Sequence, residues 1–100
     1  MQPIINEEQL KLLTEVLLSL KTEDEARSLL NDLCTIREMQ DLGQRLEVAR
    51  LLRRQMTYSD IARQTGASTA TISRVNRCLV YGAGGYRTVL ERLEKGEEND

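Results

Sequence analysis

The sequence predicts an all-α protein of about six helices that contains a helix-turn-helix. Leucine, isoleucine and valine recur at three- and four-residue spacings along most of the chain, as they do on one face of a helix. No segment of the 100 residues is a convincing strand. Aromatic residues make up only 3% of the chain, with no Phe or Trp, so the core must be built from Leu, Ile, Val and Met. Such a core favours helix-on-helix packing.

The first two expected helices lie in the first third of the chain. Asn6 can cap the first, and Thr22 precedes the second, whose acidic first turn suits the helix dipole. Leucines recur at helical spacing in the first segment: Leu10, Leu13, Leu17 and Leu20. Further apolar residues widen this stripe, so the first helix is expected to be covered from more than one side.

A Thr followed three residues later by an acidic residue predicts the start of two further helices. Thr35 with Glu38 opens a long helix, and Thr57 with Asp60 opens a short one that ends near Thr65. The long helix is expected to turn a set of apolar residues toward the core: Met39, Leu42, Leu46, Ala49 and Leu52.

Residues 58–79 have the spacing of a helix-turn-helix. Ile61 can face the core, and the small Ala62 allows a close helix crossing. Gly66 lies where the first helix must stop, and Ser68 can cap the second. The second helix has a core side at helical spacing: Ile72, Val75 and Leu79. An αα-hairpin that only packs is the alternative, but the combined offsets favour the helix-turn-helix.

The other side of the second helix is suited to reading DNA. Small and hydroxyl-bearing side chains allow close approach to base edges, and Arg can bond guanine or phosphate. The predicted DNA-contacting residues come from the turn and this helix: Gly66, Ser68, Thr69, Ala70, Thr71, Ser73, Arg74 and Arg77. Their composition, poor in strong helix formers, would follow from being read against a major groove.

The net charge of −2 conceals an uneven distribution. Residues 1–32 carry three basic and seven acidic side chains, a net charge of −4, whereas residues 33–92 carry ten and five, a net charge of +5. Residues 93–100 add −3. A basic centre is compatible with phosphate contact, although Arg residues on a solvated helix face produce the same pattern.

These residues resemble the tryptophan repressor superfamily, and in particular its repressor-like members in Gram-positive bacteria. The resemblance runs from about Leu33 to Leu93 and is carried by LGQR at 42–45, by LLRRQMTYSDIA, and most specifically by GASTATISR at 66–74. It implies an interlocked all-helical homodimer that places one recognition helix per subunit in the major groove of double-stranded DNA. Half-sites would then lie about 34 Å apart.

The resemblance also implies an effector pocket, and here the sequence departs from the family. Thr35, Arg45 and Arg74 match residues around the family's indole ligand, although Thr35 can serve as a helix cap as well. Val75 replaces a Gly, and Cys78 replaces a Ser hydroxyl. The Val75 side chain takes volume that an indole needs, and a thiol is a weak hydrogen-bond partner. We therefore expect either a different small effector or none, and no cofactor.

Other functional classes fit less well. The sequence has no His and no nucleophile beside a base, so an enzyme is not expected. The two Cys have no CxxC spacing, no signal peptide is evident, and no apolar run has membrane length. These features predict a cytoplasmic protein without a membrane partner, and the resemblance implies a bacterial one. A dimeric helical interaction module that does not bind DNA is the alternative.

The predicted organisation is a single domain over residues 1–100. A glycine-containing linker, VYGAGGYR, is expected to end the second helix of the helix-turn-helix and lead to a last helix whose apolar residues dock on the body: Val89, Leu90 and Leu93. The acidic C-terminal residues 94–100 are expected to be frayed.

Overall fold

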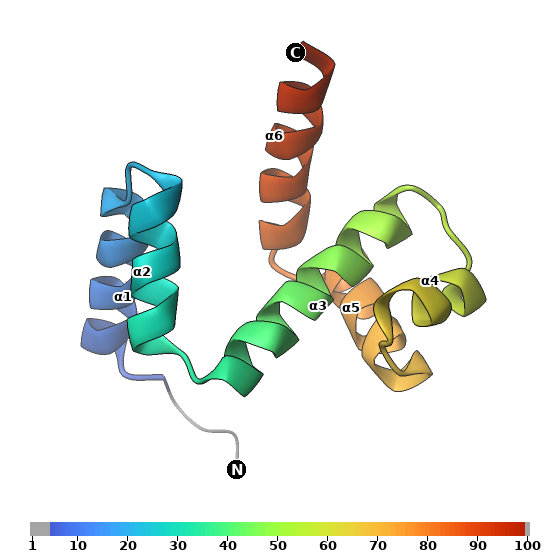
Figure 1. The fold of residues 1–100 in the computed structure, drawn as a ribbon, viewed down its shortest axis with the longest axis horizontal. Helices are drawn as coiled ribbons and strands as arrows, with labels where there is room; N and C mark the ends of the chain where they lie inside the picture. The colour runs from blue at the N-terminus through green and yellow to red at the C-terminus, as the bar shows by residue number, and fades with distance from the viewer. Residues whose placement is uncertain (1–4, 100) are drawn as a thin grey trace. The chain divides into compact units, whose positions relative to one another are not determined.

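A computed structural model of the protein describes residues 5–99, and within that range it confirms the all-α prediction (Figure 1). There are six helices and no strand among the described residues. The helices are α1 (Glu7–Ser19), α2 (Glu23–Leu33), α3 (Ile36–Arg53), α4 (Tyr58–Thr65), α5 (Thr69–Tyr81) and α6 (Gly85–Asn99). The chain divides after Ile36 into two compact units, and the single domain expected over residues 1–100 stays a prediction.

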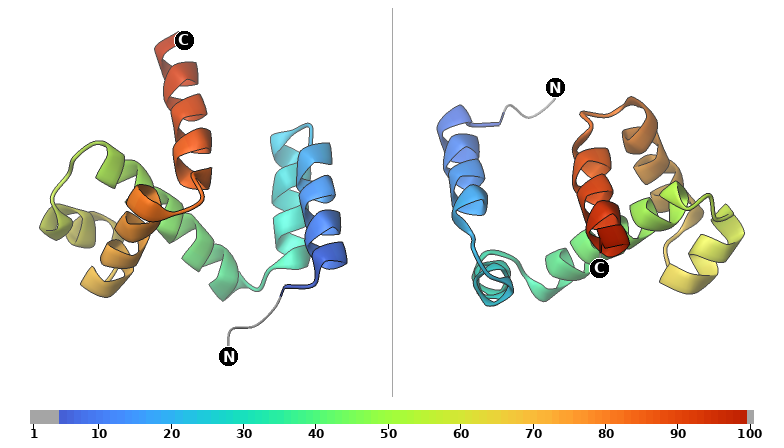
Figure 2. Two further views of the ribbon diagram at one scale, coloured as in Figure 1. Left: turned by 180° about the vertical axis from the view of Figure 1, so that it is seen from behind. Right: turned by 90° about the horizontal axis from the view of Figure 1, so that it is seen from above.

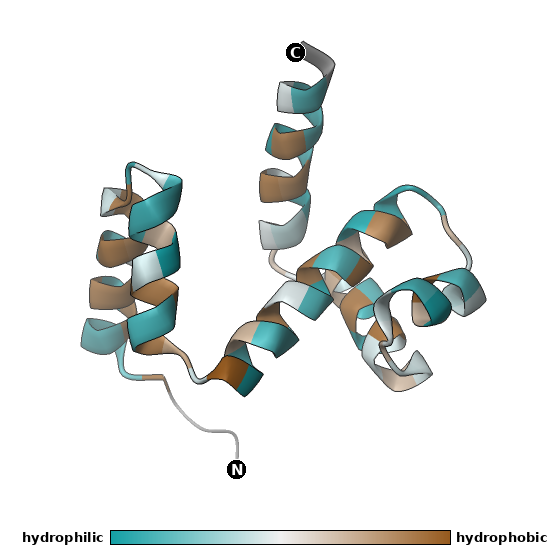
Figure 3. Cartoon of the chain, viewed as in Figure 1, coloured by the Kyte–Doolittle hydropathy of each residue, from teal (hydrophilic) through white to brown (hydrophobic). Residues whose placement is uncertain are grey.

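The first unit consists of α1 and α2, and both helices begin at the predicted caps. The Asn6 side chain accepts a hydrogen bond from the Gln9 amide at 3.1 Å, and the Thr22 hydroxyl accepts one from the Glu25 amide at 3.1 Å. Neither helix contains a buried residue. Apolar bands therefore run along exposed surface (Figure 3), and seven of the leucines in these helices are at least 36% exposed: Leu10, Leu12, Leu13, Leu17, Leu18, Leu30 and Leu33.

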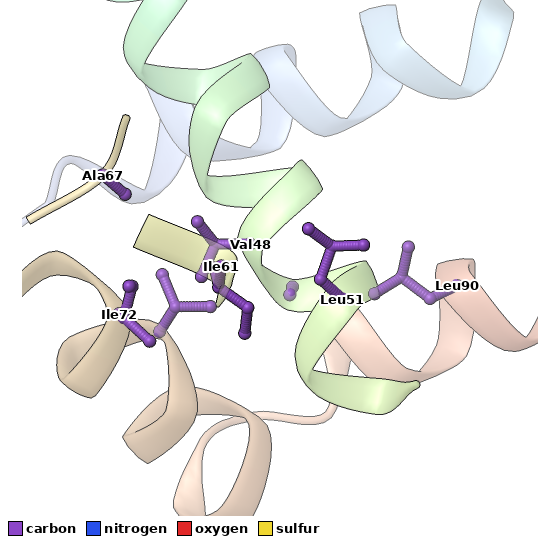
Figure 4. Close-up of a cluster of buried hydrophobic side chains, with 8 residues drawn as sticks. Val48, Leu51, Ile61, Ala67, Ile72 and Leu90 are labelled. Atoms are coloured by element: carbon purple, nitrogen blue, oxygen red, sulfur yellow. The ribbon is translucent and has the colours of Figure 1, made fainter. Parts of the chain in front are cut away.

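The second unit, α3 to α6, holds the whole cluster of buried apolar side chains (Figure 4). The cluster joins α3, α4, the turn before α5, α5 and α6 through Val48, Ala49, Leu51, Ile61, Ala67, Ile72, Val75 and Leu90. A fully buried Ile or Val contributes roughly 1.5–3 kcal/mol to stability. Helix α4 packs against α5, and α5 packs against α6, as two further views show (Figure 2). This cluster fixes the position of the helix-turn-helix on α3.

The structure corrects the predicted core face of α3. Ala49 is buried as expected, but Leu42 and Leu46 are 39% and 46% exposed. Val48 and Leu51, which the predicted face left out, are buried instead. The C-terminal half of α3 carries apolar residues on several sides, so the spacing alone did not identify the side on which α4 and α5 pack.

The last helix also differs from expectation. It begins at Gly85 after a short loop in which Gly84 has a φ of +88°, and it continues through Asn99. Residues 94–99 are therefore helical rather than frayed, and residue 100 lies outside the described residues. Of its predicted docking residues only Leu90 is buried, whereas Val89 and Leu93 are 45% and 57% exposed.

A cluster of ion pairs ties α6 to the end of α3. The Arg53 guanidinium donates to both carboxylate oxygens of Glu94 at 2.9–3.2 Å and lies 3.8 Å from Glu91. The hydrogen bonds from Arg53 lower the pKa of the Glu94 carboxyl below its usual value of 4.5, against a smaller desolvation effect. Arg54 and Glu97 form a looser pair at 3.8 Å. These contacts explain why the acidic end of α6 stays helical.

We predict that Glu94→Gln lowers the melting temperature near neutral pH and has no effect in acid. Because the folded-state pKa of Glu94 is depressed, its stabilisation is present above the unfolded-state pKa and is lost as the pH falls through the folded value. Melting curves of the wild type and the variant between about pH 7 and pH 3 should converge at the acid end. Asp41→Asn, which removes an exposed pair with Arg37 within α3, should change little at any pH. Parallel curves for the wild type and Glu94→Gln would contradict this assignment.

Candidate nucleic-acid interface

The turn between α4 and α5 has the geometry that the sequence predicted. Gly66 adopts the left-handed conformation, with φ 77° and ψ 4°, and its amide donates to the Ala62 carbonyl at 2.9 Å, which ends α4. The Ser68 hydroxyl accepts a hydrogen bond from the Thr71 amide at 3.1 Å and so caps α5. The roles predicted for Gly66 and Ser68 in the turn are thereby confirmed.

The inner side of this unit is anchored in the core. Ile61 of α4 and Ile72 of α5 are 0% exposed, Val75 is 2% exposed, and Leu79 packs against the same cluster. Ala67, inside the turn, is also buried at 5%. Since both helices and the turn contribute to one close-packed cluster, α5 is held in a single orientation relative to α3.

The outer side of α5 is free, as predicted. Five of the α5 residues expected to contact DNA are exposed: Thr69, Ala70, Ser73, Arg74 and Arg77. Within the described residues, neither Arg74 nor Arg77 has an ion pair or a hydrogen-bond partner for its guanidinium group. The exposed face of α5 therefore offers small and hydroxyl side chains near its N-terminus and two unpaired cations farther along.

Unlike these five residues, Ser68 and Thr71 use their hydroxyl groups in hydrogen bonds within the turn. Thr71 is half-buried, and its hydroxyl oxygen accepts a hydrogen bond from the Ser68 hydroxyl at 3.0 Å. Together with the capping bond, this contact closes the first turn of α5. The structure thus engages both hydroxyl groups within the turn, and a DNA contact by either remains a prediction.

Two polar residues that the sequence did not single out also hold the turn. The Thr65 hydroxyl donates to the Ile61 carbonyl at 2.7 Å and accepts from the Ala67 amide at 3.1 Å. From α3, the Gln44 side-chain amide donates to the Thr65 carbonyl at 3.3 Å. Gln44 lies within the LGQR segment, but nothing in the sequence indicates a partner 21 positions away.

The five residues of the predicted effector pocket are divided between the two units. Thr35 belongs to the first unit and the other four to the second. Val75 lies in the core, Arg45 is half-buried and Arg74 is exposed. Cys78 lines an open hollow of about 430 Å³, and Arg45, Arg74 and Val75 are not among its lining residues. The hollow is lined by Leu46, Cys78, Gly82, Ala83, Gly84, Gly85, Tyr86 and Val89. The effector pocket stays a prediction.

Two other kinds of site are absent from the described residues. No group of three or more Cys, Asp or Glu side chains in residues 5–99 is arranged to hold a metal ion. None of the helices in the described part of the chain is long and apolar enough to span a membrane.

The turn and the exposed face of α5 define a helix-turn-helix protein. Residues 8–94 match the family model described as Trp repressor protein. The chain therefore belongs to the Trp repressor family, whose members are transcription regulators and not enzymes.

Relatives of the chain support the same assignment. The uncharacterised protein YerC of Bacillus subtilis is 56% identical over 81 residues, which cover 81% of this chain and 78% of YerC. A crystal structure of a TrpR-like protein from Eubacterium eligens is 55% identical with a TM-score of 0.83, covering 87% of this chain and 90% of that one. A candidate Trp repressor from Staphylococcus aureus is 41% identical, with a TM-score of 0.83 and 87% coverage of each chain.

We predict that Gly66→Ala destabilises the protein by about 1–2 kcal/mol, because a Cβ is disfavoured at its positive φ. No atom lies within 4 Å of the added Cβ, so the cost comes from backbone conformation and not from a clash. Chemical denaturation measures the change. Gly96→Ala, inside α6 and equally free of neighbours, is the control and should stabilise by roughly 0.5–1 kcal/mol. Equal effects of the two substitutions would show that the Gly66 conformation is not needed.

Proposed function

We propose that this protein is a sequence-specific DNA-binding transcription regulator that acts as a repressor. The observation that carries the proposal is the exposed face of α5, with two unpaired Arg side chains and small residues at its start, in a member of the Trp repressor family. A helix with this face can enter the major groove N-terminus first. Such a regulator would act on the bacterial chromosome, in the cytoplasm.

The side chains on α5 suit two kinds of contact. Thr69, Ala70 and Ser73 are small enough for base edges to approach closely, and their methyl and hydroxyl groups can touch a thymine methyl or bond a base. Arg74 and Arg77 can reach phosphate oxygens or the O6 and N7 atoms of guanine. The first set would supply sequence preference, and the second would supply both affinity and preference.

A homodimer is part of this proposal. The first unit presents leucines from both helices without a buried residue, which is more apolar surface than a stable monomer usually leaves uncovered. A second copy would cover these side chains and present a second α5. The two recognition helices would then read half-sites about one helical turn, ~34 Å, apart.

The uncovered leucines also favour one alternative function, in which the protein binds another protein and not DNA. An exposed apolar hairpin on a chain of net charge −2 is what a helical protein-interaction module would present. Salt-sensitive DNA binding that depends on α5 distinguishes the two functions, because such a module would bind no promoter fragment.

We predict that Arg77→Ala and Ser73→Ala weaken binding to the operator in different ways. Loss of a phosphate contact by Arg77 should reduce the slope of log K against log salt by about 1 and weaken binding to all sequences alike. Loss of a base contact by Ser73 should cost about 1–3 kcal/mol on the preferred sequence only. Gel shifts on fragments selected from the genome measure both effects.

Arg92→Ala is the matched control for this experiment, because Arg92 is an exposed cation on α6 outside the helix-turn-helix. It should leave the affinity and its salt slope unchanged. If Arg92→Ala and Arg77→Ala weaken binding equally, the α5 face is not the reading surface.

A further prediction concerns the effector. Val75 is 2% exposed within the core, and Cys78, which lines an open hollow, offers a thiol there. We expect tryptophan at micromolar concentrations to leave the melting temperature unchanged. A screen of amino acids and indoles by thermal melting tests this, and a tryptophan-dependent rise would refute the argument from Val75 and Cys78.

A further inference from the structure

Among the side-chain nitrogen and oxygen atoms of the described residues, one is buried without a hydrogen-bond partner: the Nε of Arg50 in α3. The next two arginines along the chain do have acidic partners, since Arg53 pairs with Glu91 and Glu94, and Arg54 pairs with Glu97. A buried donor without an acceptor costs about 1–3 kcal/mol and calls for an explanation. A ligand or partner that approaches Arg50 would supply the acceptor.

Arg50 lies beside an open apolar groove between α3 and α6. The groove has a volume of about 360 Å³ and is lined by Gly43, Leu46, Glu47, Arg50, Val89, Leu90 and Leu93. Leu46, Val89 and Leu93 are each at least 45% exposed. Glu47 lines the same groove but forms no ion pair with Arg50. The site therefore combines an apolar floor with an unpaired guanidinium.

We propose that a carboxylate from the first unit of a second copy pairs with Arg50, while leucines of that unit fill the groove. This inference rests on the homodimer of the proposed function and names the contact that secures it. The occupant has matching properties, because residues 1–32 carry a net charge of −4 and their helices expose unburied leucines. An amphipathic acidic helix is the complement of a groove that joins apolar side chains to a cation.

Two acidic residues of the first unit already have partners within it, which leaves fewer carboxylates that could pair with Arg50. Glu23 already pairs with Arg27 at 2.7 Å, and Glu25 accepts a hydrogen bond from the Lys21 amide. The remaining carboxylates within the described part of the unit have no ion pair there: Glu7, Glu8, Glu15, Asp24 and Asp32. One of these five is expected to bind Arg50, in the two-pronged geometry that guanidinium and carboxylate groups favour.

The first test measures self-association by sedimentation equilibrium at several salt concentrations. Arg50→Gln should weaken the dimer at least ~10-fold, because the partner carboxylate would lose its cation, and should flatten the salt dependence. Arg92→Gln removes an exposed cation on α6, away from Arg50 on α3 in sequence, and should change neither quantity. The Arg50 side chain makes no hydrogen bond in the described part of the chain, so Arg50→Gln should keep the helical circular dichroism of the wild type.

The second test identifies the partner by charge reversal. Arg50→Glu should abolish association at concentrations where the wild type is dimeric. Each of the five carboxylates is then changed to Lys in the Arg50→Glu background, and one of these double variants should recover the dimer. Recovery by none of them would overturn the first unit as the source of the carboxylate.

The outcomes separate this inference from the proposed function. If the wild type dimerises and Arg50→Gln associates as tightly as Arg92→Gln, the Arg50 contact is wrong and the homodimer stands. If the wild type is monomeric at every concentration while it still binds DNA, the homodimer is wrong and the Arg50 contact falls with it.

Discussion

The packing of Ile61 and Ile72 beside Val48 of α3 is the interaction on which the rest of the second unit depends. All three side chains are fully buried, and they come from three different helices (Figure 4). Because helix α5 has Ile72 and Val75 on its inner side, its opposite side must face away from α3. The exposure of Ser73, Arg74 and Arg77 is thus a geometric consequence of core packing.

The same core is too small to cover the chain's apolar surface. It consists of eight buried side chains, all of them in the second unit. Seven leucines of α1 and α2, and Leu46 and Leu93 along the groove between α3 and α6, remain exposed. A short chain that places its apolar residues in this way gains stability by association, and that is the physical basis of the proposed homodimer and of the role proposed for Arg50 within it.

Local signals in the sequence were reliable wherever the deciding contact lies within a few residues. The caps Asn6, Thr22, Thr57 and Ser68 bond the amide three residues later. Gly66 adopts its positive φ because the chain must stop one helix and start another within a few residues. The residues predicted to face the core from α4 and α5 do so, since both helices are short and each has one clearly apolar side.

The sequence by itself determined the six helices, the helix-turn-helix and the composition of the outer face of α5. Tertiary structure alone decided that Val48 and Leu51 rather than Leu42 and Leu46 enter the core, and that the acidic end of α6 stays helical against Arg53. It also decided that Gln44 holds the turn and that the Nε of Arg50 is buried without a partner. The physical reason is distance along the chain. Caps and turns are set by neighbours, whereas the bonds of Gln44 and Arg53 span 21 and 41 positions and depend on how whole helices pack.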